Sequence, residues 1–142
     1  LFLAGEAQDF LEAENYFRAE VSSPDRSADE ITEGCCVAAR AARLRGAAVT
    51  FFKYTSKAIT GDGCSEICCE LGHFYEETGD FEEAAVWYYN AAYETQPVLA
   101  LRSSEEEPLQ GLIRCYEQLG LPAQVRSYAE ELKHRQNEKT DN

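Results

Sequence analysis

The segment that decides the fold is Cys68 to Pro97, which reads CCELGHFYEETGDFEEAAVWYYNAAYETQP. Apolar and small residues recur at helical spacing on both sides of Gly79-Asp80, which predicts two antiparallel helices joined by a short turn. We expect Gly79 to end the first helix, because glycine accepts the left-handed backbone conformation. We expect Asp80 to cap the second, because its carboxylate accepts a free backbone N–H.

The spacing in this segment is that of the tetratricopeptide (TPR) repeat, a helical hairpin of about 34 residues. The positions that match are Leu71-Gly72, Tyr75, Gly79, Ala84, Tyr88, Ala91 and Pro97. Gly72 and Ala84 are small enough to let the helices approach closely, and Tyr75 and Tyr88 would fill the space between them. Such a hairpin cannot bury its apolar face alone, so it implies neighbouring hairpins.

The pattern recurs along the chain. Gly46 and Gly79 are 33 residues apart, whereas Gly79 and Gly120 are 41 apart. We assign the excess to a longer connection at 96–107. Helices are predicted at about 1–4, 9–21, 28–45, 47–60, 65–78, 80–95, 105–119 and 122–135, with turns at 61–63 and 97–104 and with Ser65 as a further cap.

The resulting prediction is an all-α domain over residues 1–135, with antiparallel helical hairpins stacked as a right-handed TPR-like superhelix. It would hold about three and a half hairpins, the first one truncated. Residues 136–142 are polar and without periodicity, so we expect a disordered tail. The chain contains no methionine and opens partway through a hairpin, so we expect it to be a fragment with more sequence upstream.

Composition limits the classes of function. The formal net charge of the 142 residues is −13, which argues against nucleic acid as a partner. No apolar run approaches the roughly 18 residues of a membrane span, and no secretory signal opens the chain. The six cysteines lack the spacing of a zinc module, which favours a reducing, cytoplasmic location.

No motif points to catalysis. The chain has no D-x-D pair, no glycine-rich phosphate loop and no G-x-S-x-G elbow, and its histidines are His73 and His134. Cys64/Cys68 and Cys69/His73 each lie four residues apart and share helix faces, but buried thiols usually serve as small core hydrophobes. We therefore expect no catalytic, cofactor or metal site in these residues.

The first helix of each hairpin is the expected binding surface, because TPR arrays commonly hold extended peptides or another domain in their concave groove. The candidate partner-binding residues are Arg40, Arg43, His73, Glu76, Arg114 and Glu117. Their arginines would suit a carboxylate on a peptide, a protein or the parent chain's own catalytic domain. The competing interpretation is that they form ion pairs between helices, with Glu33, Glu66 or Glu107. Cys36 and Cys69 occupy the positions of the lysine and asparagine in chaperone-type carboxylate clamps, so a chaperone-tail receptor is disfavoured.

Aromatic residues concentrate on the predicted second helices. They are Phe51, Phe52, Tyr54, Trp87, Tyr88, Tyr89 and Tyr93. Packing between hairpins accounts for most of them, while one or two on the convex side could dock a neighbouring domain.

Five stretches resemble one family more particularly: ARAARLRG (39–46), FFKY (51–54), CSEICCELGHFYEE (64–77), AAVWYYNAAYET (84–95) and LQGLIRCYEQLGLP (109–122). From about Asp9 to Arg135 the chain resembles the C-terminal helical region that follows the catalytic domain of bacterial family 2, GT-A type glycosyltransferases. The resemblance implies a parent enzyme that transfers sugar from a nucleotide donor to a cell-envelope acceptor. That family's metal-binding and base residues lie upstream, so none falls on this chain. Ala47 departs from the aspartate usual after the glycine, which affects only the cap of that helix.

These observations together predict a non-catalytic TPR interaction or scaffolding region, the C-terminal part of a cytoplasmic glycosyltransferase. The alternative is a stand-alone TPR adaptor that binds a peptide or protein partner.

Overall fold

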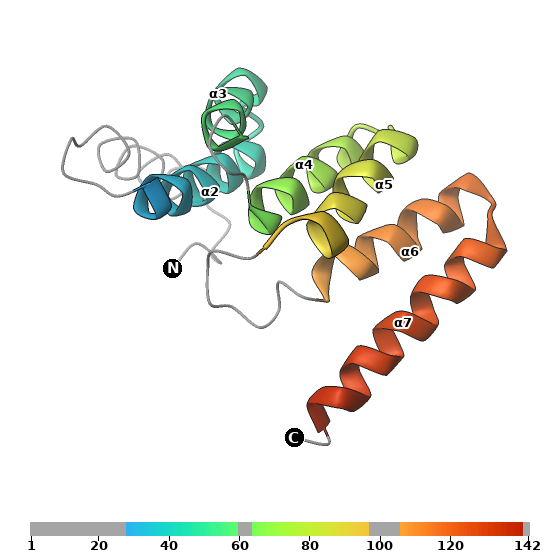
Figure 1. The fold of residues 1–142 in the computed structure, drawn as a ribbon. Coiled ribbons are helices and arrows are strands. Elements are labelled where there is room, and N and C mark those ends of the chain that lie inside the picture. Colours follow the sequence, from blue (N-terminus) through green and yellow to red (C-terminus); the bar gives the residue numbers. More distant parts are fainter. Residues whose placement is uncertain (1–27, 60–63, 97–105, 141–142) are drawn as a thin grey trace.

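The structure is a computed structural model that describes residues 28–59, 64–96 and 106–140. Apart from short turns these residues are helical, and they include no strand (Figure 1). The elements in order are α2 (Ala28–Leu44), α3 (Ala48–Ile59), α4 (Ser65–Glu77), α5 (Phe81–Tyr89), the π-helical turn η1 (Asn90–Glu94) that continues α5, α6 (Glu107–Leu119) and α7 (Pro122–Thr140). The predicted all-α class is confirmed for them. The helices predicted at 1–4 and 9–21 and the turns at 61–63 and 97–104 lie outside the described residues.

The helices follow one another as pairs. α2 packs on α3, α4 on α5, and α6 on α7, while α5 also packs on α6. In addition, α4 contacts both α2 and α6. The predicted helix ends at Gly46, Gly79 and Gly120 are confirmed, because these residues have φ of 78°, 84° and 72°, the left-handed conformation that glycine adopts at little cost.

Among the predicted helix boundaries, the cap at Asp80 is confirmed and two others need correction. Asp80 caps α5 as expected, since its Oδ1 accepts the Glu83 N–H at 3.2 Å. Ser65 does not cap α4, because the helix already begins at Ser65 and Cys64 is the N-cap residue, without a side-chain cap hydrogen bond. The Ser65 N–H donates to the Gln96 carbonyl at 3.0 Å. α7 also continues past 135 to Thr140, where a disordered tail was predicted. A contact of 3.1 Å between His134 and Glu138 supports this last stretch at i,i+4 spacing.

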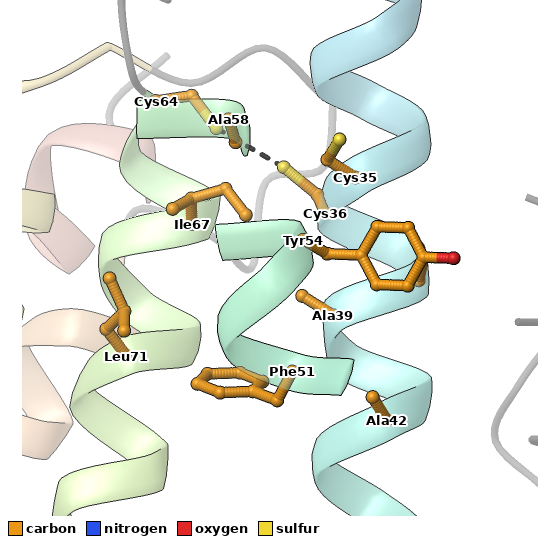
Figure 2. Packing of buried hydrophobic residues seen from close by; sticks show 11 residues of the cluster. Cys35, Cys36, Ala39, Ala42, Phe51, Tyr54, Ala58, Cys64, Ile67 and Leu71 are labelled. Carbon is orange, nitrogen blue, oxygen red and sulfur yellow. Dashed lines mark hydrogen bonds between the residues drawn. The ribbon is translucent and has the colours of Figure 1, made fainter. Parts of the chain in front are cut away.

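The interior is built from two clusters of buried side chains. In the first, small residues of α2 such as Ala39 and Ala42 let α3 approach, so that Phe51 and Tyr54 are covered (Figure 2). The second lies between α4, α5 and α6, and its members are Cys68, Cys69, Ala84, Ala85, Tyr88, Ala91, Leu109, Leu112 and Cys115. Tyr75 and Trp87 pack against both clusters, so the hairpins share one interior.

Tyr88 is the tightest point of this interior. Its ring lies between two helical glycines, Gly72 of α4 and Gly111 of α6. A Cβ at Gly72 would lie 2.6 Å from the ring, and one at Gly111 would lie 2.5 Å from it. The predicted role of Gly72 in close helix approach is therefore confirmed, and Gly111 has the same role in the next hairpin.

No helix of the described part is long and apolar enough to cross a membrane.

Candidate functional site

Most of the predicted binding residues lie where α4 meets its two neighbours among the first helices, α2 and α6. We call this surface the first-helix face and define it by Arg40, Arg43, Glu70, His73, Glu76, Glu77, Glu107 and Arg114. The candidates from different hairpins are brought into contact there through charged and polar side chains. The face is therefore a network that joins the helices as well as a surface.

Arg43, in the last turn of α2, holds α2 to α4. Its Nε donates to Glu70 Oε2 at 2.7 Å, and the two side chains are only 8% and 9% exposed. A second bond reaches Glu77. Burial lowers the pKa of Arg43, but the charges and hydrogen bonds of the two glutamates outweigh it and raise the pKa above its usual value. Arg43 is thus a charged side chain neutralised within the fold.

Arg114 of α6 holds α6 to α4 in a comparable way. It donates to Glu76 through two nitrogens, from Nε to Oε2 at 2.8 Å and from Nη2 to Oε1 at 3.0 Å. The bond is more exposed than that of Arg43, with Arg114 at 46% and Glu76 at 20%. Burial raises the pKa of Glu76, but hydrogen bonds from Arg114 and Tyr88 bring it below its usual value.

The ion-pair interpretation of these two arginines is confirmed, but the predicted acceptors were wrong. The partners are Glu70 and Glu77 for Arg43 and Glu76 for Arg114. Arg43 lies at the C-terminal end of α2, beside the middle and end of α4. Glu33 and Glu66 lie earlier in those helices. Glu107, the third predicted acceptor, pairs with His73 instead.

A hydrogen-bonded chain runs from Arg114 to Glu107 through the buried Tyr88. The Tyr88 hydroxyl donates to Glu76 Oε1 at 2.6 Å and lies 2.7 Å from His73 Nδ1. Burial, and then the neighbouring Glu76, raise the pKa of Tyr88 well above its usual value. His73 Nε2 in turn lies 2.6 Å from Glu107 Oε1 and 3.6 Å from Cys69 Sγ. Its hydrogen bond lowers the pKa of Glu107 below its usual value, against the effect of burial.

Arg40 and Glu117 differ from the other candidates. Arg40 is half-buried and forms no ion pair with another described residue, although its charge contributes to the low pKa of Glu107. Glu117 is exposed on α6. Its side chain joins no ion pair within the described ranges, so the structure does not bring it to the other five.

Three members of the first-helix face, Glu70, Glu77 and Glu107, and the adjacent Cys69 were not among the predicted binding residues; Glu107 was predicted only as an acceptor for an arginine. Glu70 lies three residues before His73 and seven before Glu77, so helical spacing puts it on the same side of α4 as both. This spacing could have identified Glu70 from the sequence. Cys69 was noted only as a neighbour of His73 at i,i+4. Glu107 had no local signal, because it begins α6 after a connection whose length follows no repeat rule.

A pocket of about 420 Å³ opens elsewhere, between α5 and α6. Its lining residues are Glu82, Ala85, Val86, Tyr89, Asn90, Tyr116, Leu119 and Leu121. The packing role predicted for the aromatic residues is confirmed for Phe51, Tyr54 and Tyr88, which are buried, while Tyr89 is 42% exposed at this pocket.

All six cysteines are buried and free of disulfides. Cys36 Sγ lies 3.3 Å from Cys64 Sγ across α2 and α4, as the dashed line in Figure 2 marks. Burial raises the pKa of Cys68 to about 11 and that of Cys115 to about 12. Cys68 and Cys115 thus behave as core groups, as the sequence indicated.

Comparison of the chain with protein-family models, with curated proteins and with solved structures found no match.

Proposed function

We propose that this chain is a non-catalytic TPR-like interaction region whose first helices carry the binding face. The observation that supports it most is the contact of α4 with both α2 and α6. In a TPR superhelix the first helices of successive hairpins form one inner layer, and contacts between alternate helices are what such a layer requires. The continuous interior through Tyr75 and Trp87 suits the same arrangement.

The binding surface in this proposal is the first-helix face, and its ligand is an acidic group. Arg43 and Arg114 are neutralised by glutamates of α4, so their contribution is to hold the helices. Arg40 forms no ion pair with another described residue, and a partner carboxylate would give it one. The half-exposed Glu107 lies at the edge of this position: the hydrogen bond to His73 lowers its pKa most, and the charge of Arg40 lowers it further.

The partner in the proposal is the catalytic domain of the same polypeptide, or a protein that this enzyme must be held against. The parent would be a bacterial glycosyltransferase of the family 2, GT-A type, acting in the cytoplasm on a cell-envelope acceptor. The resemblance of the five quoted stretches to the C-terminal region of those enzymes supports this assignment. A stand-alone adaptor would use the same face for a peptide or protein.

Charge reversal of Arg40 tests the face. We expect Arg40→Glu to weaken binding of the isolated catalytic domain, added in trans, by at least about tenfold, or about 1.4 kcal/mol. Arg126→Glu is the matched control, because Arg126 is exposed on α7, away from the face. Titration calorimetry of both variants against the unmodified chain gives the measurement. Equal affinity of Arg40→Glu and the unmodified chain would remove Arg40 from the binding surface.

A further inference from the structure

One group of side chains on the first-helix face has the composition of a metal site. Cys69 and His73 lie one turn apart on α4, and Glu107 comes from the start of α6. Their ligand atoms, Sγ, Nε2 and a carboxylate oxygen, all lie within 4.8 Å of one another. Cys69 is 7% exposed, and the side chains of His73 and Glu107 are 16% and 38% exposed. The group is therefore partly shielded, with an opening on the Glu107 side.

The hydrogen bonds behind His73 fix which of its nitrogens is available. The Tyr88 hydroxyl has one proton and donates it to Glu76, so toward His73 Nδ1 it can only accept. Nδ1 must then carry a proton, and in the neutral imidazole the lone pair is on Nε2. Nε2 is the atom that faces Glu107 and Cys69.

A lone pair, a carboxylate and a sulfur atom thus converge on one point. They need a positive charge between them, either a second proton on His73 or a cation. A histidine whose other nitrogen donates to an oriented acceptor is the usual arrangement around bound metal, because it fixes the tautomer and the direction of the ring. Arg114, Glu76 and Tyr88 supply that support, in a chain of bonds between 2.6 and 3.0 Å.

We propose that Cys69, His73 and Glu107 bind a zinc ion that joins α4 to α6. Sulfur, imidazole nitrogen and carboxylate oxygen are the three zinc ligands that proteins use, and three protein ligands leave a fourth position for water. Thiolate and carboxylate together carry two negative charges, which balance Zn²⁺. Binding forms the Zn–S bond and releases the Cys69 thiol proton to solvent. The nearby Arg43 and Arg114 already have glutamate partners, whereas Arg40, whose charge acts on Glu107, opposes the ion.

The distance between His73 and Glu107 must lengthen when the ion binds. Ligands at about 2.0–2.2 Å from a tetrahedral ion are roughly 3.3 Å apart, whereas His73 Nε2 and Glu107 Oε1 are 2.6 Å apart. Glu107 is the first residue of α6 and partly exposed, so its carboxylate can move outward. This inference goes beyond the interaction role and does not depend on it.

Zinc chloride titrated into the 142-residue chain under reducing conditions tests the site by calorimetry. We expect one equivalent to bind, and Cys69→Ser and Glu107→Gln each to weaken binding by at least about 10–100-fold. Cys68→Ser is the matched control, because Cys68 is the adjacent buried thiol and is not in the group. We expect it to bind zinc as the unmodified chain does, and likewise Cys64→Ser, which removes the Cys36–Cys64 thiol pair.

Cobalt(II) gives a second readout that does not need a variant to fold. The unmodified chain with Co²⁺ should show a thiolate-to-metal charge-transfer band and the intense d–d absorption of a four-coordinate ion. Absence of saturable zinc binding, or of the thiolate band, would overturn the proposal. So would loss of binding in Cys64→Ser with Cys69→Ser unaffected, because the metal would then be at the other thiols.

Discussion

Gly111→Ala is expected to lower the free energy of unfolding by about 1–2 kcal/mol, although alanine is normally the better helix former. Alanine gains up to about 1 kcal/mol over glycine inside a helix. Here its Cβ would lie 2.5 Å from the Tyr88 ring, and overpacking of a filled core costs about 1–3 kcal/mol, occasionally more. The ring cannot retreat, because Gly72 lies against it and its hydroxyl is bonded to Glu76 and His73. The cost of steric overlap with Tyr88 therefore exceeds the gain in helix propensity from alanine.

Urea unfolding in two backgrounds isolates this effect. In a Tyr88→Leu chain the side chain that meets the new methyl group is smaller, so Gly111→Ala should be neutral or stabilising there, by up to about 1 kcal/mol. An equal cost in both backgrounds would mean that Tyr88 is not what makes alanine unfavourable at this position.

Arg43→Met is expected to cost about 3–5 kcal/mol, the usual penalty for removing one partner of a buried ion pair. Glu70, itself only 6% exposed, would keep a buried charge without its nearest cation. Arg114→Met is the control, because the Arg114–Glu76 bond is far more exposed and exposed bridges contribute roughly 0–1 kcal/mol. Chemical denaturation of the two variants gives the comparison.

A second variant separates lost charge pairing from lost packing. Arg43→Met combined with Glu70→Gln removes the uncompensated charge, so most of the stability should return. Similar losses for Arg43→Met and Arg114→Met, without recovery in the double variant, would contradict the role assigned to Arg43. If Arg43→Met loses this much stability, its partner affinity does not separate lost binding from unfolding. Partner binding is therefore tested at Arg40 instead.

The helix ends were the most predictable part of the fold. Gly46, Gly79 and Gly120 each end a helix in the left-handed conformation, a requirement that is local and visible in the sequence. Ser65 is not the cap because the helix begins one residue earlier than predicted, which puts Cys64 at the N-cap position; the Ser65 N–H is held by Gln96, a partner 31 residues away. The end of α7 was placed too early because its last turns are polar and hold their helix through contacts within α7 itself.

The candidate site was predictable in some of its residues but not in its connections. Helical register placed Arg43, His73 and Glu76 together on the groove side of the first helices, as a surface for a partner. Which glutamate each arginine finds depends on the axial offset between helices, and no repeat spacing fixes that offset after the long connection before α6. Glu107 therefore entered the site, beside His73, only once the helices were placed.

The measurement that tests the central claim most directly is nucleoside diphosphate release from a panel of UDP- and GDP-linked sugars. It compares the 142-residue chain with the full-length product of the reading frame that encodes it. A non-catalytic region attached to a glycosyltransferase predicts release by the full-length protein and none by the 142-residue chain. Release of nucleoside diphosphate by the 142-residue chain on its own would contradict the account. If neither protein releases it, the stand-alone adaptor replaces the glycosyltransferase assignment.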